Sequence, residues 1–280
     1  MGREGDAELR LRAAATCYPA RPSGVEVSLR VFVATVAASA LALGLWGCRA
    51  APARAPVVVF AASSLTDAFG ALEKDFEAAH PSLDLQLSFA GSQVLRLQIE
   101  QGARADLFAS ADLEHVQALH AAGLAGMARI FARNGLALIV PEANPAGLRR
   151  FEDLPRARRI VLGAPQVPAG RYADEALRKV GLPFAEQVQA RVVSRETNVR
   201  LVRAKVALGE ADAALVYRTD THGVAGITVL PLPDAVQVAA AYPIATVAAG
   251  PNPAGASAFL AFLQGAQAQR VLQAHGFLAP

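Results

Sequence analysis

The succession of short apolar runs and amphipathic segments is the feature of this sequence that most constrains its fold. Apolar runs with strand character, such as residues 57–60 and 136–140, are separated by segments in which apolar residues recur at helical spacing. Leu65, Phe69 and Leu72 illustrate that spacing. Strands that alternate with helices favour sheets of parallel strands that are covered by helices on both faces. The sequence therefore predicts an α/β protein with mostly parallel sheets.

The same patterns place individual elements along the chain. We expect strands over residues 57–60, 83–89, 107–109, 136–140, 160–162, 192–193, 213–217 and 236–244. We expect helices over residues 65–76, 93–100, 113–119, 172–180 and 199–208, and two more between residues 257 and 276. Asp112 is a candidate cap for the helix after it, and glycines 102, 123, 181 and 209 mark helix ends. About 220 residues of this pattern are long for one sheet, so we expect two lobes.

An apolar, uncharged stretch near the N-terminus has the composition of an export signal. Residues 31–47 follow Arg30 and end at Cys48, and no other apolar run approaches the length of a membrane span, which excludes a polytopic membrane protein. Residues 45–48 resemble a lipoprotein box, in which the cysteine is acylated; an ordinary signal cleaved between residues 51 and 55 is the alternative. Cleavage before Cys48 would remove Cys17, so the exported chain would form no internal disulfide.

Composition and charge exclude two classes of protein. Hydrophobic residues make up 53% of the 280 residues and charged residues 18%, which is incompatible with a disordered chain. The net charge is +3, and no run of basic residues is interleaved with aromatic ones. Binding to nucleic acid is therefore not expected.

Small, uncharged residues occupy the points where predicted strands lead into helices. Ligands of open α/β sheets bind at the carboxyl ends of the strands, where helix N-termini present free N–H groups. The residues at these junctions are Ser63, Ser64, Gly91, Ser92, Ser110, Ala111, 168–170 and 197–199, and Tyr217 ends another strand. Converging hydroxyls and helix dipoles can hold a small anion without a cationic side chain. The alternative is that each residue only caps a helix, as Ser64 and Asp67 would in a capping box.

The sequence gives little support to an enzyme. The histidines, at positions 80, 115, 120, 222 and 275, are scattered, and no zinc-binding, nucleophile-elbow or phosphate-loop motif occurs. Four aspartates that could act as acids or bases are expected to be solvated caps and turn formers: Asp67, Asp106, Asp112 and Asp220. Tyr172 is expected to pack on a helix face. We predict no cofactor.

Segments at these junctions resemble the periplasmic molybdate-binding proteins of bacterial ABC transporters. In chain order they are FAASSLTDAF (60–69), FAGSQ (89–93), QIEQGARADLFASAD (98–112), VPAGRYADEAL (167–177), TNVR (197–200) and GEADAALVYRTD (209–220). YPIA (242–245) and the closing GF (276–277) are similar too. The resemblance covers essentially all of the chain after the apolar segment.

The resemblance implies a type II periplasmic-binding-protein fold, in which two α/β lobes joined by a hinge of crossing strands close on a ligand. We assign residues 1–56 to a signal peptide and linker, and we expect a first lobe over 57–134 and 243–280 and a second lobe over 135–242. The oxyanion would be held through its oxygens, with no protein atom bound to the metal. The hydroxyls that match the family are those of Ser64, Ser92 and Tyr217, and the matching backbone N–H groups are those of Ala111, Ala169 and Val199.

The function that this resemblance implies is capture of molybdate or tungstate and delivery to an ABC permease. We expect a monomer that is not an enzyme and that lies in the periplasm or is anchored to the outer face of the membrane through Cys48. The same fold with sulfate, thiosulfate or a small organic anion as ligand is an alternative, and a serine hydrolase that uses Ser64 or Ser92 is a more distant one. Gln93 and Arg104 depart from the family pattern; Gln93 would alter the loop beside Ser92, and Arg104 should lie off the site.

Overall fold

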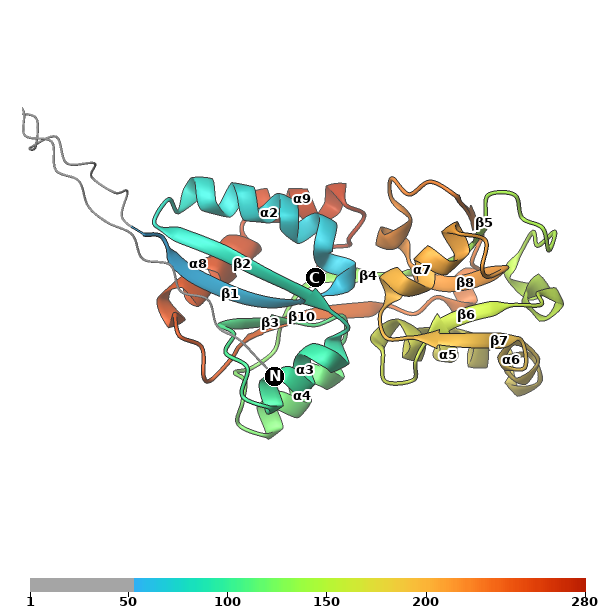
Figure 1. The fold of residues 1–280 in the computed structure, drawn as a ribbon, viewed down its shortest axis with the longest axis horizontal. Helices are drawn as coiled ribbons and strands as arrows, with labels where there is room; N and C mark the ends of the chain where they lie inside the picture. Colours follow the sequence, from blue (N-terminus) through green and yellow to red (C-terminus); the bar gives the residue numbers. More distant parts are fainter. Residues whose placement is uncertain (1–52) are drawn as a thin grey trace, which may run out of the picture. The chain divides into compact units, whose positions relative to one another are not determined.

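The computed structural model describes residues 53–280, which form two five-stranded sheets with their helices (Figure 1). The predicted export signal and Cys48 lie outside the described residues, so cleavage and acylation stay predictions. None of the helices in the described range is both long and apolar enough to cross a bilayer.

The first sheet has the strand order β2-β1-β3-β10-β4. Its strands are β1 (Ala55–Ala62), β2 (Leu83–Ala90), β3 (Leu107–Ala109), β4 (Arg129–Asn134) and β10 (Ala240–Thr246). The helices on one face are α2 (Thr66–Ala79), α8 (Pro253–Gln264) and α9 (Ala266–Ala274), and those on the other are α3 (Ser92–Glu100) and α4 (Leu113–Ala121) (Figure 1). We call this sheet and its helices the first lobe.

Strand β1 shows how the sequence builds this layered arrangement. Successive side chains of a strand point to opposite faces of its sheet. Val57 and Val59 belong to the core that contains Phe69 of α2, whereas Phe60 packs with Phe108 in the core beneath α3 and α4. Because both faces are covered, the strand is a continuous apolar run rather than an alternating one.

The second sheet has the strand order β7-β6-β8-β5-β9 and forms the second lobe with its helices. Its strands are β5 (Leu136–Pro141), β6 (Ile160–Gly163), β7 (Val192–Glu196), β8 (Ala213–Tyr217) and β9 (Ile227–Leu230). Its helices are α5 (Pro168–Val180), α6 (Leu182–Gln189) and α7 (Val199–Ala207). Leu177 of α5 and Val188 of α6 share one core with Leu215 of β8, while Val202 of α7 and Val216 belong to a cluster that continues into the first lobe.

Two connections join the lobes. β4 leads into β5 through Gly135 alone, and β9 leads to β10 through residues 231–239. Tyr242 of β10 contacts Tyr217 of β8 at the crossing, with ring centroids 5.6 Å apart, and Phe277 at 5.2 Å. The lobe boundaries stay predictions, and the one at residue 242 falls inside β10.

The sheets are mixed, which corrects the prediction of mostly parallel sheets. Four strand pairings are parallel and four are antiparallel. β5 and β10 account for all four antiparallel pairings. Each of these strands arrives from the other lobe and so enters its sheet at the carboxyl ends of the parallel strands, which forces it to run in the opposite direction.

Several element boundaries differ from the sequence patterns. Helix α5 begins at Pro168 rather than at 172, because a proline at the first helical position needs no N–H partner. β10 begins at Ala240 rather than at 236, after a 3₁₀ turn over Asp234–Val236. β4, β9 and α6 were not predicted. β9 is only four residues long, Ile227–Leu230, which is too short for its apolar pattern to mark a strand.

Two glycines let the first turn of α5 approach the end of β6. A Cβ atom on Gly170 would lie 2.3 Å from the carbonyl oxygen of Ala164 and 2.4 Å from that of Gly163. A Cβ atom on Gly163 would lie 2.8 Å from the backbone nitrogen of Gly170. These neighbours are backbone atoms that cannot move aside independently, so the position of the α5 N-terminus requires glycine at both sites.

We expect Gly170→Ala to lower the free energy of unfolding by at least about 1 kcal/mol, and the melting temperature by about 2–4 °C, because the added methyl group meets backbone atoms. Gly70→Ala is the matched control, since a Cβ atom at this position in α2 meets nothing within 4 Å. The control should be stabilised by up to about 1 kcal/mol through helix propensity. Thermal unfolding measures both; wild-type melting of Gly170→Ala would contradict the close approach.

Candidate anion-binding site

A small cavity lies where the two lobes meet. Its lining residues come from both lobes and comprise Ala62, Ser63, Ser64, Gly91, Ser92, Ala111, Val167, Pro168, Ala169, Asn198, Val199 and Tyr217. Its volume is about 10 Å³, which is close to the minimum that holds one water molecule. All six residues that the family motifs indicate line this one cavity. Their contact with a ligand stays a prediction.

The cavity is surrounded by the beginnings of helices. Ser92 begins α3, Ala111 precedes the cap of α4, Ala169 is in the first turn of α5 and Val199 begins α7. The N–H groups of a first helical turn have no acceptor in a preceding turn, and the helix dipole places partial positive charge there. No residue of the described cavity lining carries a charged side chain. The site therefore has the character of a neutral cluster of hydrogen-bond donors.

Ser64 lies in the 3₁₀ turn Ser63–Leu65 that follows β1, and its hydroxyl is hydrogen-bonded inside the protein. Its Oγ lies 2.9 Å from Tyr242 Oη, and the Tyr242 hydroxyl in turn lies 3.4 Å from Asn134 Nδ2. All three side chains are buried, with exposed fractions of 7%, 0% and 1% for Ser64, Tyr242 and Asn134. Sequence analysis gave Tyr242 no polar role, because it lies 178 positions from the serine that it contacts.

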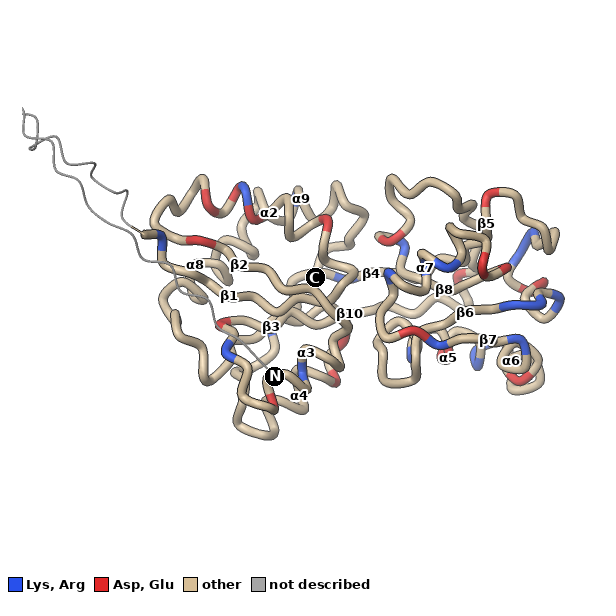
Figure 2. The backbone as a smooth tube through the Cα atoms, in the orientation of Figure 1, with Lys and Arg blue, Asp and Glu red and all other residues tan. Residues whose placement is uncertain are grey.

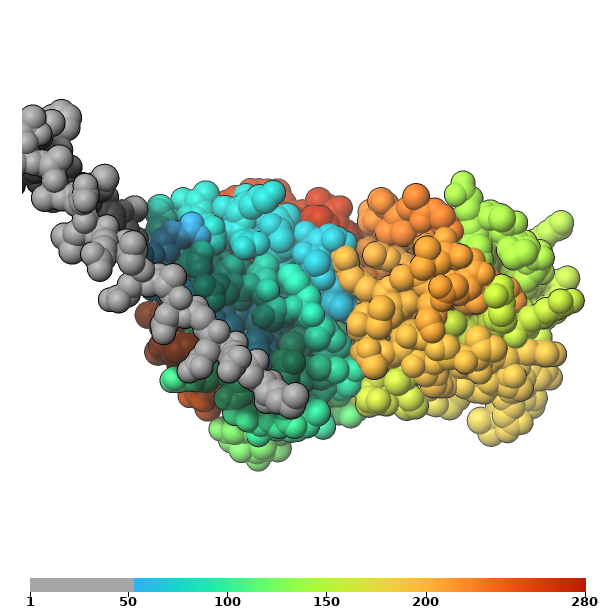
Figure 3. Space-filling model, viewed as in Figure 1, coloured from blue at the N-terminus to red at the C-terminus, as the bar shows by residue number. Residues whose placement is uncertain are grey.

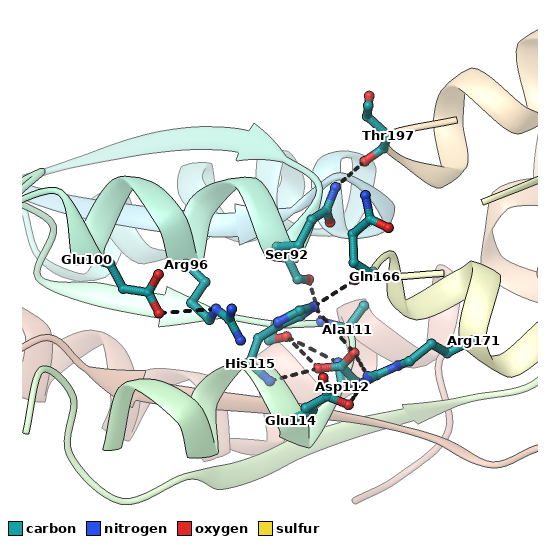
Figure 4. Close-up of polar contacts among 12 residues, drawn as sticks. Ser92, Arg96, Glu100, Ala111, Asp112, Glu114, His115, Gln166, Arg171 and Thr197 are labelled. Atoms are coloured by element: carbon teal, nitrogen blue, oxygen red, sulfur yellow. Dashed lines mark hydrogen bonds and ion pairs between the residues drawn. The ribbon is translucent and has the colours of Figure 1, made fainter. Parts of the chain in front are cut away.

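Ser92 and Ala111 are joined by a hydrogen bond. The Ala111 N–H donates to Ser92 Oγ at 3.1 Å, so this N–H, which the family motif indicated as a ligand donor, has a protein acceptor (Figure 4). With a lone pair of Ser92 occupied in this way, the serine retains its own O–H hydrogen for another acceptor.

Tyr217 presents a buried hydroxyl to the cavity. The residue is 1% exposed, and its Oη has no hydrogen-bond partner among the described residues. Burial raises the pKa of Tyr217 well above its ordinary value, so the group stays a protonated donor. The ring of Tyr172 packs against it with centroids 6.3 Å apart, which agrees with the packing role predicted for Tyr172.

Charged groups lie around the cavity rather than in it, and they pair across the lobes. Arg200 of the second lobe donates from Nε to the Ser63 carbonyl at 3.0 Å and pairs with Asp67. Arg171 of the second lobe pairs with Asp112 and Glu114 of the first (Figure 4). Along the backbone, Lys and Arg positions are scattered over both lobes (Figure 2). The charges of Arg171 and Arg200 are matched by carboxylates of the first lobe, so these ion pairs hold the two lobes together. We call the two arginines with their partners the clasps.

Two neutral hydrogen bonds also span the lobes. Gln93 donates from Nε2 to the Thr197 carbonyl at 2.7 Å, and His115 contacts the Gln166 carbonyl through Nε2 at 3.1 Å (Figure 4). Burial is the main cause that lowers the pKa of His115, against the raising effect of Asp112. Gln93, which departs from the family pattern, thus bridges the lobes, whereas Arg104 is exposed and outside the cavity lining. The lobe surfaces meet along a seam on the face drawn in Figure 3.

Three of the four aspartates expected to be solvated are buried, which corrects that prediction. Asp67 is exposed, but Asp106, Asp112 and Asp220 are at most 2% exposed. Asp112 caps α4 as expected, accepting from the His115 N–H at 3.2 Å. Asp106 accepts from the backbone N–H groups of Val58 at 2.8 Å and Asn252 at 2.5 Å, so it joins β1 to the segment before α8. Sequence spacing could not reveal acceptors that serve such distant donors.

Among these buried carboxyl groups, Asp220 is the one whose negative charge the surrounding groups stabilise least. Its Oδ2 has no hydrogen-bond partner in the part of the chain that the structure describes. Burial raises the pKa of Asp220 to about 7, although the charges of Arg203 and Arg200 oppose the shift. The unfolded chain releases this proton near pH 4, so between about pH 4 and pH 7 the folded protein binds more protons and loses stability as the pH rises.

Asp220→Asn should remove this loss of stability. We expect the variant to melt above the wild type at pH 8 by at least about 2–4 °C, and the difference to shrink toward pH 5. Asp234→Asn, at an exposed position, is the matched control and should show no such trend. Thermal unfolding across this pH range is the measurement, and a pH-independent difference for Asp220→Asn would contradict the raised pKa.

Comparisons with known proteins give the family of the chain. Residues 57–278 match the family model described as "Bacterial extracellular solute-binding protein". The molybdate-binding protein ModA of Mycobacterium tuberculosis strain H37Rv is 38% identical over 227 residues, which cover 80% of this chain and 85% of that protein.

Two solved structures share the fold at low sequence identity. The periplasmic molybdate-binding protein of Azotobacter vinelandii matches with a TM-score of 0.70 and 22% identity over 80% of this chain and 99% of its own. The sulfate-binding protein SubI of Mycobacterium tuberculosis matches with a TM-score of 0.74 and 18% identity over 80% of this chain and 86% of its own. The two-lobed type II fold is thereby confirmed. Since the family model spans nearly all of the described residues, the chain belongs to the family of bacterial extracellular solute-binding proteins.

Proposed function

We propose that this protein captures molybdate or tungstate outside the cytoplasm and delivers it to an ABC permease. The observation that carries the proposal is the cavity between the lobes, whose described lining offers hydroxyls and first-turn N–H groups and no charged side chain. The 38% sequence identity to a molybdate-binding protein supports molybdate as the ligand.

A fully deprotonated tetrahedral dianion suits a cavity that only donates. Ser64 and Ser92 would donate from the first lobe, and Ala169, Val199 and Tyr217 from the second. Each hydrogen bond to a charged group contributes about 1.5–3 kcal/mol, so several together can offset the cost of removing the anion from water. We assign to Ala111 an orienting role, because its N–H donates to Ser92 Oγ and so directs that hydroxyl toward the ligand.

Closure of the lobes would report that the ligand is bound. A ligand that contacts both lobes binds more tightly to their closed arrangement and shifts the equilibrium toward it. The clasps formed by Arg171 and Arg200 would add to the stability of that arrangement. A permease could then recognise the loaded protein by the surface that only the closed lobes present.

Selectivity would rest on protonation and size. Phosphate carries a proton at neutral pH, and that proton would face a donor in this cavity. Sulfate has the same charge and shape as molybdate but is smaller, so only the fit of the cavity can separate them. The high structural similarity to a sulfate-binding protein favours the view that the backbone fold alone does not make this distinction. Sulfate, thiosulfate or a small organic anion is the alternative ligand.

The contacts of the two serines argue against a hydrolase. A serine nucleophile needs a general base within hydrogen-bond reach. Ser64 Oγ is hydrogen-bonded to Tyr242 Oη and Ser92 Oγ to the Ala111 N–H, and within residues 53–280 neither hydroxyl is hydrogen-bonded to a histidine.

We further propose export with acylation at Cys48, which the N-terminal mass of the exported protein would test.

Isothermal titration with molybdate, tungstate, sulfate and phosphate tests the proposed ligand. We expect molybdate and tungstate to bind at least about 100-fold more tightly than phosphate, because an unpaired donor facing the phosphate proton costs about 1–3 kcal/mol and size adds to the difference. Tight binding of sulfate with weak binding of molybdate would replace the proposed ligand by the alternative. No binding of any of the four would overturn the anion site.

Tyr217→Phe tests the site itself. Loss of the Tyr217 hydroxyl, which is buried and has no described partner, should weaken molybdate binding by about 10- to 150-fold, which corresponds to about 1.5–3 kcal/mol. The melting temperature of the unliganded protein should not fall, since no hydrogen bond within the described residues is lost. Tyr172→Phe is the matched control, as its side chain does not line the cavity. Equal affinity of Tyr217→Phe and wild type would show that the ligand lies elsewhere.

A further inference from the structure

We propose that Tyr242, held by Asn134, fixes the Ser64 hydroxyl as a donor into the cavity and thereby excludes anions that carry a proton. Tyr242 is then a positioning and specificity-determining residue that does not itself touch the ligand, because it does not line the cavity. This inference rests on the proposed capture of an oxyanion at that cavity.

The orientation of Asn134 is set first. Its Oδ1 accepts a hydrogen bond from the Gly135 N–H at 3.0 Å, so this atom must be the carbonyl oxygen. The amide nitrogen Nδ2 therefore faces the other way, 2.9 Å from Thr219 Oγ1 and 3.4 Å from Tyr242 Oη. An amide NH₂ group donates and does not accept. Toward Tyr242, Asn134 can act only as a donor.

The direction of the next hydrogen bond follows. The Tyr242 hydroxyl has one hydrogen and its two recorded partners are Asn134 Nδ2 and Ser64 Oγ. Only the serine oxygen can accept. Tyr242 is fully buried, and a buried hydroxyl hydrogen without an acceptor is costly. Tyr242 must therefore donate to Ser64 Oγ, which lies 2.9 Å away.

Ser64 is left with its own hydrogen for the cavity. Its oxygen accepts from Tyr242, so the Ser64 O–H can donate to a ligand, just as Ser92 can because its oxygen accepts from the Ala111 N–H. Burial raises the pKa of Tyr242 well above its ordinary value, so this pattern holds throughout the physiological pH range. One lone pair of each serine oxygen is taken inside the protein, so in the arrangement that we infer both serines point their hydrogens at the ligand, and a ligand oxygen that carries a proton meets another hydrogen there.

Tyr242→Phe would release this constraint while keeping the ring. The aromatic contacts with Tyr217 and Phe277 remain, but Ser64 Oγ loses the donor that occupied its lone pair. With both of its lone pairs free, Ser64 Oγ can then accept a hydrogen bond from a ligand oxygen that carries a proton. The variant should bind protonated anions better in relation to unprotonated ones.

Sulfate and phosphate are the probes, because they are similar in size and shape but only phosphate carries a proton at pH 7. Affinities are measured by displacement titration, with molybdate added to protein that has been loaded with sulfate or phosphate. In the wild type sulfate should bind more tightly than phosphate. In Tyr242→Phe we expect the ratio of their dissociation constants to shift toward phosphate by at least about tenfold.

A double-mutant cycle with Ser64→Ala separates this effect from a general disturbance of the site. Once the Ser64 hydroxyl is absent, the further change Tyr242→Phe should leave the sulfate-to-phosphate ratio unchanged within about twofold. Thermal unfolding of each variant checks that it is folded. If Tyr242→Phe is unstable, Ser64→Ala still tests the proposal, because loss of the serine donor should also weaken the preference for sulfate over phosphate.

The outcomes distinguish the two proposals. A wild type that binds no oxyanion overturns the proposed function. A wild type that binds molybdate and prefers sulfate to phosphate, with the same preference in Tyr242→Phe, overturns the role of Tyr242 and leaves the proposed function standing. A shift in Tyr242→Phe that persists in the Ser64→Ala background also overturns it, since the effect would not pass through Ser64.

Discussion

An anion can be held without a cation if the groups around it point hydrogens, and not lone pairs, at it. Internal hydrogen bonds favour this arrangement in the cavity of this protein: Tyr242 donates to Ser64 Oγ, and the Ala111 N–H donates to Ser92 Oγ. The hydroxyl of Tyr217 has no described partner and stays protonated. Most other features of the fold serve to bring these hydroxyls and several helix N-termini to one point.

The contacts within each lobe differ in kind from those around the cavity. Within the lobes, apolar cores on both faces of each sheet hold the strand ends in place. Between the lobes one apolar cluster continues through the crossing strands, where Tyr217 packs on Tyr242, but around the cavity polar contacts are added, such as the clasps of Arg171 and Arg200 and the hydrogen bond from Gln93 to Thr197. Water can replace polar contacts at small cost, whereas exposure of apolar cores is expensive. Such a division favours rigid lobes whose separation a ligand can change.

Much of the fold and the composition of the site could be predicted from the sequence. Apolar periodicity placed β1, β3, α2 and α7, because these patterns depend on neighbours a few positions apart. The motifs gathered six residues that do line one cavity. The antiparallel course of β10 could not be predicted, because it depends on the lobe from which the strand arrives. Burial of Asp106 and Asp220 was also missed, since a carboxylate beside a turn has the same sequence pattern whether water or distant protein surrounds it.

By itself the sequence determined the alternation of strands and helices, the caps and the small, uncharged residues at the strand ends, since these depend on local backbone chemistry. The tertiary structure alone decided which hydroxyl donates to which. Ser64 and Tyr242 are 178 positions apart, and Asn134 and Tyr242 are 108 apart. A hydroxyl can donate or accept, and nothing in its local sequence selects between the two. The choice is made by the partners that the fold places within about 3 Å, and through them the fold determines what the cavity can bind.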